Sequence, residues 1–303
     1  MTIARRSFIT GATAATAASL SPFRGWAKTS LSLGQVQIDT LSDGYLIQPG
    51  AFALGDLSPD AARPILARYG ITPDRFEPPC NVTLLRDGTN TVLFDVGSGP
   101  DFVPTAGTLM DAFDTLGITP DDITHVVFTH THADHLWGLL DDFDDLMFPD
   151  AQHMIGKTEF DYWTDPETVN NVSENRVQMA VGAKRRLDAI EDQIITFRDG
   201  EEILPGIMAR ATFGHTPGHM SFQTAGGAMI LGDAVVNHHL AFERPDWHAG
   251  PDQDPDLAAQ TRVSLLDQLA AEHLTIVGFH LPNGGIGHTE RNGDSYRFVP
   301  DET

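Results

Sequence analysis

One short segment constrains this chain more than any other feature of its sequence, because it packs three histidines and an aspartate into six residues. It reads Thr129-His130-Thr131-His132-Ala133-Asp134-His135. The apolar run at 124–128 before it predicts a strand, and the run at 136–140 after it predicts a helix. In an extended segment the side chains of His130 and His132 point the same way. Asp134 and His135 lie where the chain turns into the helix. The loop can therefore present two adjacent sets of metal ligands.

Three later residues with metal-binding side chains stand in a turn or at strand ends. His215 lies in a Pro-Gly turn, Asp233 ends one predicted strand, and His280 ends another. Ligands at the carboxyl ends of successive strands converge on one edge of a sheet in α/β proteins. Cys80 is the only cysteine, so the sequence excludes an intrachain disulfide and a multi-thiolate zinc site.

Short β-type runs alternate with helical runs along the chain, which indicates an α/β protein. Two such halves predict stacked sheets with helices outside, a layered sandwich. No linker, repeat or long charge block marks a second domain, so we expect one domain over residues 28–303. The predicted elements are strands at 91–94, 124–128, 228–231 and 275–279, a helix at 109–116, and a helix at 255–271 with Asp254 at its N-cap and Pro255 in its first turn.

Residues 1–27 have the layout of an export signal. Arg5 and Arg6 precede a weakly apolar stretch rich in Ala, Gly and Thr, and the segment ends at Ala27, where we expect cleavage. The paired arginines resemble a twin-arginine signal, which predicts a periplasmic protein. The apolar part falls short of the roughly 20 residues of a membrane span, so we expect no membrane attachment after the signal is removed.

The charge of the chain excludes one class of partner. It carries 42 acidic and 19 basic residues, a formal net charge of −23. Such a chain repels nucleic acid, which argues against a nucleic-acid-binding protein. The acidic cluster at 141–145 lacks the Gly and Glu spacing of an EF-hand loop and is interpreted as a solvated surface.

The His-x-His-x-Asp-His loop with a later His, Asp and His resembles the signature of the metallo-β-lactamase-fold hydrolases. The resemblance covers the chain from about residue 80 to its end. It implies a four-layer αββα sandwich of two pseudo-repeated halves and a pair of divalent metal ions, zinc first, with manganese, iron or cobalt as alternatives. It also implies the ligands: His130, His132 and His215 for one metal, Asp134, His135 and His280 for the second, and Asp233 bridging both.

The resemblance assigns supporting roles as well. Asp95 matches the early aspartate of the family, which usually supports a ligand histidine from behind. His219 is interpreted as a structural hydrogen-bonding residue, and His238 and His239 as lining of the substrate pocket. Trp163 has two interpretations: an aromatic wall of that pocket, or part of a helix that buries its aromatic residues in the core.

The segments at 161–163 and 279–300 resemble the methyl parathion hydrolase-like branch of the family. That branch implies a small-molecule substrate with an ester-type bond: a lactone, a carboxyl or aryl ester, or an organophosphate triester. A metal-bridging hydroxide would attack this bond. Asp233 is the candidate catalytic residue that orients the hydroxide and passes its proton to the leaving group.

Three alternatives stay open at this point. A mononuclear iron sulfur dioxygenase shares the fold and the loop, and a periplasmic metal-binding protein would hold the metal without turnover. A β-lactamase is not favoured, because the thiolate-bearing lactamases place a cysteine in the second metal's ligand set, whereas Cys80 is expected to be a core residue. The segment 28–80 is long enough to contribute to a homodimer contact.

Overall fold

The computed structural model describes residues 28–301, and each of its two large sheets comes from one half of the chain. In spatial order, the first sheet contains β1 (Lys28–Leu33), β2 (Val36–Tyr45), β5 (Pro79–Arg86), β6 (Thr91–Phe94), β7 (His125–Phe128), β8 (Gln152–Gly156) and β9 (Ile195–Phe197). The second contains β10 (Glu202–Leu204), β11 (Ile207–Ala211), β12 (Met220–Thr224), β13 (Ala228–Ile230), β14 (Thr275–Val277), β15 (Ile286–Asn292) and β16 (Ser295–Pro300).

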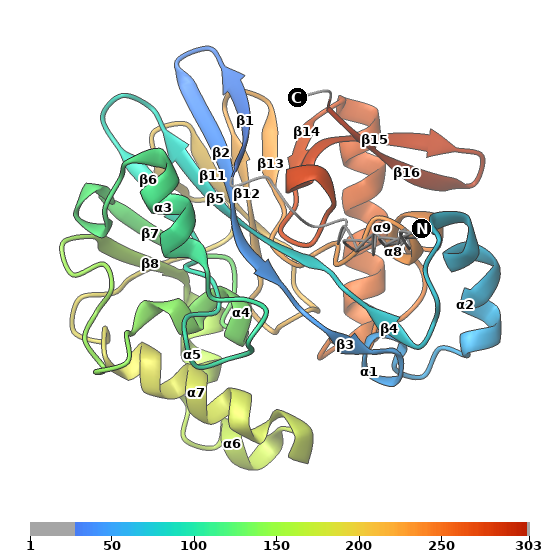
Figure 1. Ribbon diagram of the computed structural model, residues 1–303, viewed down its shortest axis with the longest axis horizontal. Coiled ribbons are helices and arrows are strands. Elements are labelled where there is room, and N and C mark those ends of the chain that lie inside the picture. Colours follow the sequence, from blue (N-terminus) through green and yellow to red (C-terminus); the bar gives the residue numbers. More distant parts are fainter. Residues whose placement is uncertain (1–27, 302–303) are drawn as a thin grey trace, which may run out of the picture.

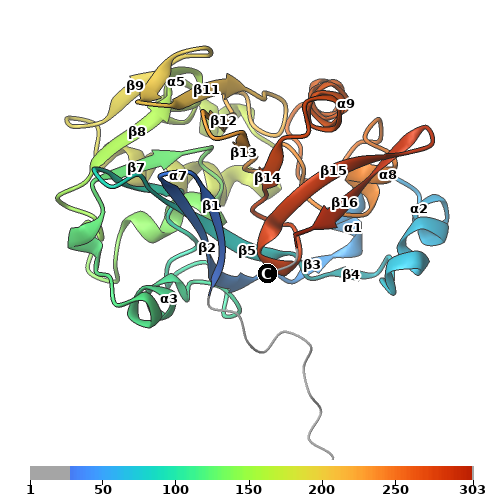
Figure 2. The same ribbon diagram turned by 90° about the horizontal axis from the view of Figure 1, so that it is seen from above.

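The two sheets stack face to face, and helices cover their outer faces (Figures 1 and 2). The first sheet is covered by α3 (Leu109–Leu116), α4 (Ala133–Leu136), α5 (Lys157–Thr164) and α7 (Val177–Asp188), with the short α6 (Thr168–Asn171) beside α7. The second is covered by α9 (Pro255–Glu272), with α8 (Leu240–Glu243) near its edge. The predicted four-layer sandwich is confirmed.

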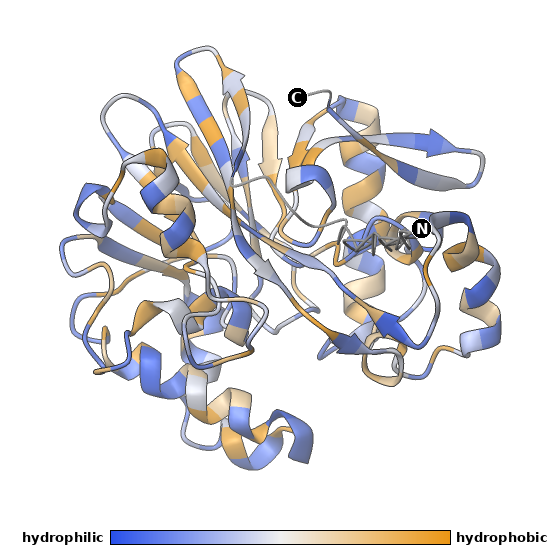
Figure 3. Ribbon diagram, viewed as in Figure 1, coloured by the Kyte–Doolittle hydropathy of each residue, from blue (hydrophilic) through white to orange (hydrophobic). Residues whose placement is uncertain are grey.

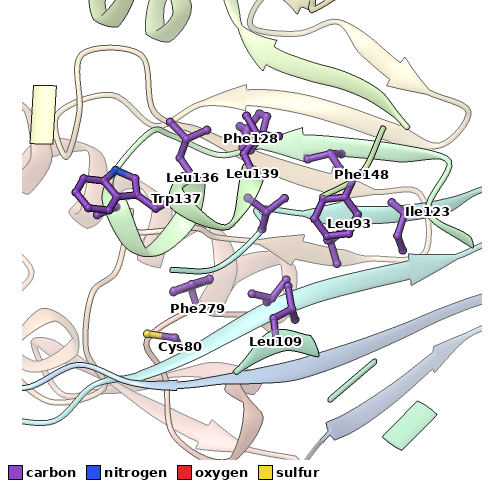
Figure 4. Close-up of a cluster of buried hydrophobic side chains, with 14 of the residues drawn as sticks. Cys80, Leu93, Leu109, Ile123, Phe128, Leu136, Trp137, Leu139, Phe148 and Phe279 are labelled. Atoms are coloured by element: carbon purple, nitrogen blue, oxygen red, sulfur yellow. The ribbon is translucent and has the colours of Figure 1, made fainter. Parts of the chain in front are cut away.

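Apolar side chains fill the space between the sheets and under each helical layer. Phe94 of β6 and Phe222 of β12 meet between the sheets, with ring centroids 5.1 Å apart. Figure 3 shows the apolar residues concentrated on the strands, with polar residues on the outward faces of the helices. Figure 4 shows the cluster under the first helical layer, which contains Leu93, Phe128 and Leu136. Burial of this apolar surface is the main force that holds the layers together.

The elements predicted from the sequence are present, but β13 and β14 end at Ile230 and Val277, before the predicted ends of these strands, and one helix differs more. The helix predicted at 136–140 begins earlier, as α4 at Ala133, and continues only as a 3-10 turn to Leu139. The reason is that the Gly138 amide donates to the Gly97 carbonyl at 2.9 Å instead of extending a helix. The helix predicted at 255–271 is α9, and the Asp254 side chain caps it by accepting from the Leu257 amide at 3.0 Å.

A smaller unit, residues 48–76, lies outside the sandwich, and we call it the cap. It contains β3 (Gln48–Pro49), α1 (Gly50–Leu54), α2 (Pro59–Leu66) and β4 (Arg75–Phe76), and it lies at the right of Figure 1. Leu54, Leu66 and Phe76 form a small core of its own. Across residues 28–301, none of the helices combines the length and apolar character of a membrane span. The export signal predicted at 1–27 lies outside the described residues.

Candidate metal centre

Parallel pairing of strands brings the predicted ligands to one edge of the sandwich. β6 pairs in parallel with β7, and β13 pairs in parallel with β14. The chain leaves β7 into the loop with His130 and His132, and leaves β13 and β14 just before Asp233 and His280. Gly232 precedes Asp233 with φ 52°, and a Cβ there would come within 2.7 Å of His219 Nε2. The turn that directs Asp233 into the site therefore requires glycine.

The first group of candidate ligands consists of His130, His132, His215 and Asp233. One ligand atom from each lies within 4.8 Å of the others, and all four residues are buried. His215 Nε2 lies 2.9 Å from His132 Nδ1 and 3.3 Å from Asp233 Oδ2. His130 Nε2 lies 4.0 Å from the same oxygen.

The second group consists of Asp134, His135 and His280, and it also meets Asp233. His280 Nε2 lies 3.2 Å from Asp134 Oδ2 and 3.3 Å from Asp233 Oδ2. His135 Nε2 lies 3.3 Å from Asp233 Oδ1. The Asp233 carboxylate therefore stands between the two groups, as expected of a bridging ligand, and the structure brings together all seven predicted ligands.

The other ring nitrogen of several histidines is fixed from behind. His135 Nδ1 lies 2.8 Å from Asp95 Oδ2, and Asp95 also accepts from the Thr129 amide at 2.8 Å. Asp95 has φ 63°, an uncommon conformation that turns its side chain toward this contact. His219 is not placed as a ligand, because its Nε2 accepts a hydrogen bond from the Asp233 amide at 2.9 Å. Both residues thus have the supporting roles that the sequence suggested.

Asp252 is a supporting residue that the sequence analysis missed. Its Oδ1 lies 2.9 Å from His215 Nδ1, and its Oδ2 lies 3.4 Å from the buried Arg262 guanidinium. Asp252 lies in an irregular, acidic loop before α9 with no motif around it, so nothing in the sequence distinguishes it from neighbouring acids.

The electrostatics of the groups suit a cationic occupant. Burial holds the pKa of His130 and His132 well below the ordinary value, which leaves both imidazoles neutral. Burial also disfavours a charge on His135, but the carboxylates of Asp233, Asp134 and Asp95 together outweigh it and raise the pKa of His135 to about 10. Burial alone would raise the pKa of Asp233, yet His280 and His135 hold it well below its usual range. Without metals, the raised pKa values of His135 and His280 favour protonated imidazoles beside the Asp233 carboxylate.

Several buried atoms in the two groups lie close to one another, yet no hydrogen bond of acceptable geometry satisfies them among the described residues. Such atoms normally cost free energy in a protein interior. A divalent cation bound by imidazole nitrogens and carboxylate oxygens would satisfy them together. The residues therefore fit divalent metal ions. The unpartnered atoms are His130 Nε2, His132 Nε2, Asp134 Oδ2, His135 Nε2 and Asp233 Oδ1.

Glu159 is a second residue that the sequence analysis missed. It lies on α5, is fully buried, and accepts from the Thr131 amide at 3.0 Å and from the Thr216 hydroxyl at 2.8 Å. Trp163, one turn later, donates to the same carboxylate at 2.8 Å. Trp163 is 1% exposed and does not line the cavity described below, so the interpretation of Trp163 as a pocket wall is corrected to a core position. The reason is the α5 register, which places Glu159 and Trp163 on the same inward face.

Cys80 is buried in the core, as expected, but it is not remote from the ligands. Its sulfur, an Asp134 carboxylate oxygen and a His280 nitrogen lie within 4.8 Å of one another. Burial raises the pKa of the Cys80 thiol to about 12 in the metal-free protein. The interpretation of Cys80 as a core residue is confirmed, and the structure adds that this core position lies beside the second ligand group.

A cavity of about 1070 Å³ opens onto the ligands. The cap contributes apolar side chains to its wall, among them Phe52 and Phe76, and α7 contributes Met179. His238 and His239 line it as well, as the sequence suggested. The ligands that reach the cavity are His132, Asp134, His215, Asp233 and His280.

Comparisons with known proteins agree with this arrangement. Residues 75–280 match the family model of the metallo-beta-lactamase superfamily. Rv2581c of Mycobacterium tuberculosis, an uncharacterized protein, is 28% identical over 225 residues, which cover 73% of this chain and 91% of that protein. YobT of Bacillus subtilis, also uncharacterized, is 33% identical over 113 residues, 37% of this chain. That match spans only 46% of the length of YobT.

Two solved structures share the fold. AidC, described as a dizinc quorum-quenching lactonase, has a TM-score of 0.85 at 23% identity, covering 91% of this chain and 98% of AidC. AbOPH, described as a hydrolase in the beta lactamase superfamily, has a TM-score of 0.84 at 26% identity with the same coverage. The likeness to AidC shows the fold alone.

Proposed function

The chain belongs to the metallo-beta-lactamase superfamily, and on that basis we propose that it is a hydrolase that binds two divalent metal ions and cleaves ester-type bonds. The observation that carries the proposal is the position of Asp233 beside a large cavity: it groups with His130, His132 and His215, and it lies 3.3 Å from both His135 Nε2 and His280 Nε2. A sulfur dioxygenase with one iron would need only the first group. The second group, with its own buried and unpartnered atoms, favours a pair of metals.

The ligand residues divide the work of such a reaction. When bound, the ions would supply a hydroxide nucleophile at neutral pH and polarise the carbonyl or phosphoryl oxygen of the substrate. Asp233 accepts the proton of the attacking water and delivers it to the leaving-group oxygen. Its amide is fixed by His219, so the carboxylate is held in place for this transfer. Asp95 and Asp252 keep the rings of His135 and His215 in orientation.

The cavity supports an uncharged substrate with an apolar part. Its wall carries Phe52, Phe76 and Met179, and the acidic chain repels anionic molecules. We place the chain in the methyl parathion hydrolase-like branch and propose a lactone, a carboxyl or aryl ester, or an organophosphate triester as its substrate class. The descriptions of AidC as a lactonase and of AbOPH as a hydrolase support this choice.

A substrate panel on metal-defined protein tests the function. Aryl esters, lactones, phosphotriesters and β-lactams would be offered to the zinc-loaded chain and to Asp233→Ala, with Asp142→Ala, an exposed acid, as the matched control. We expect turnover of an ester-type class by the wild type and the control, and its loss in Asp233→Ala. Turnover confined to β-lactams, or thiol-dependent oxygen uptake by a protein with one iron, would overturn the proposal.

We further propose that residues 1–27 direct twin-arginine export to the periplasm and that 28–303 is the mature hydrolase domain, in which 28–80 contributes to a homodimer contact. A folded-state route would let the protein load its metals before export. A reporter fused to residues 1–27 should be exported only while Arg5 and Arg6 are intact. Export that survives replacement of both by lysine would instead indicate the general secretory route. Light scattering of the mature chain measures the oligomeric state.

A further inference from the structure

Cys80 lies at the start of β5, where the first sheet meets the loop that carries His280. The Cys80 sulfur lies within 4.8 Å of candidate ligand atoms of both Asp134 and His280, and its side chain is fully buried. In Figure 4, Cys80 stands at one end of the apolar cluster beside Phe279, the residue before His280. The only thiol of the chain is thus placed next to the second ligand group.

The residues on both sides of Cys80 hold this place firmly. The Pro79 carbonyl lies 2.7 Å from His280 Nδ1 and orients the ring so that Nε2 faces the ligand group. The Asn81 amide donates to the Phe279 carbonyl at 3.0 Å, and its side chain donates to the Leu281 carbonyl at 2.8 Å. Hydrogen bonds therefore join the segments 79–81 and 279–281 around Cys80 and His280. They hold the Cys80 sulfur close to the His280 imidazole.

The atoms around the sulfur point to a shared occupant. Asp134 is 6% exposed, and its Oδ2 lies 3.2 Å from His280 Nε2 and 3.6 Å from His135 Nε2 without a hydrogen bond of acceptable geometry among the described residues. Oxygen, nitrogen and sulfur donors thus meet in one buried place. Thiolate is a soft ligand that favours zinc and cadmium, whereas a site with carboxylate and imidazole alone also accepts manganese.

We propose that Cys80 Sγ is an additional ligand of the second metal position, beside Asp134, His135 and His280. On binding, the S–H proton passes to solvent, and the sulfur lone pair forms the bond to the metal, with no change of oxidation state. The sulfur thereby biases this position toward soft divalent ions. The inference rests on the proposed metal centre, but it does not depend on which bond the enzyme cleaves.

The single cysteine makes the test direct. The metal-free full chain is titrated with cadmium, and the ultraviolet band of sulfur-to-metal charge transfer is recorded; any thiolate band must come from Cys80. We expect the band in the wild type and not in Cys80→Ser. We also expect the ratio of cadmium to manganese affinity to fall at least about tenfold in Cys80→Ser, because the soft donor is lost. Cys80→Ala, which also removes the sulfur but places no hydroxyl in the core, is expected to behave like Cys80→Ser.

The cadmium titration of the wild type alone tests the proposal, even if the variants fold poorly. Absence of the band in wild-type protein that holds two cadmium ions per chain would overturn the proposal, as would unchanged cadmium and manganese affinities in a folded Cys80→Ser. Either result would show that Cys80 is core packing only. A charge-transfer band in a protein that hydrolyses no ester would contradict the proposed function and leave the ligand assignment in place.

Discussion

The buried Glu159 carboxylate accepts a hydrogen bond from the Thr216 hydroxyl at 2.8 Å, although the two residues lie 57 positions apart in the sequence. Thr216 directly follows the ligand His215. The same carboxylate accepts from Thr131, which lies between the ligands His130 and His132. One side chain outside the ligand groups therefore sets the separation of the two loops that carry His130, His132 and His215.

Replacing Glu159 by glutamine is expected to weaken metal binding at the first group by about 10- to 100-fold, because the amide presents donors where Thr131 and Thr216 need an acceptor. Competition with a chelator measures the effect. Glu191→Gln changes an exposed glutamate and serves as the control. Equal metal affinities in Glu159→Gln and the control would show that Glu159 does not position the loops.

Asp252 is expected to stabilise the fold as well as to orient His215. It faces the buried Arg262, and removing one partner of a buried pair leaves an uncompensated charge. Asp252→Ala should therefore lower the free energy of unfolding of the metal-free chain by about 3 to 5 kcal/mol, measured with urea. Asp294→Ala, at an exposed position, should leave it unchanged. A loss equal to that of the control would contradict the buried pair.

Asp43 is expected to make the free energy of unfolding depend on pH. It is fully buried beneath the loop 97–109 and accepts from the Ser98 and Leu109 amides, and burial raises its pKa to about 6. The folded state therefore holds a proton that the unfolded state has lost between about pH 4 and pH 6. Relative to Asp43→Asn, the metal-free wild type should lose about 2 to 3 kcal/mol of stability as the pH rises through this window. A parallel pH dependence of the two proteins would contradict the raised pKa.

A single substitution, His132→Ala, tests whether the loop 129–135 forms the active site. His132→Ala should lose most of the bound metal and the turnover together, because His132 contributes to the first group and lines the cavity. His273→Ala, which lies at the end of α9 away from the ligands, provides the control. Full turnover by His132→Ala would show that this loop is not the active site.

The sequence predicts the ligands better than the residues that hold them. His130 to His135 are recognisable because the chemistry is concentrated in one loop, and Asp233 and His280 because they end strands. Glu159 and Asp252 support ligands from other segments, and only the packing of α5 and of the loop before α9 brings them there. Cys80 shows the same limit. It lies 200 positions before His280 in the sequence, and the two come together only because segments 79–81 and 279–281 pair.

The proposed function depends most on Asp233 as the bridge of a pair of metals. Elemental analysis of the full chain, purified after growth with zinc, tests this together with ester turnover on the same sample. We expect about two zinc ions per chain in the wild type, with Asp233→Ala losing metal from both groups and all turnover. One iron per chain, or a wild-type metal content kept in an active Asp233→Ala, would contradict it.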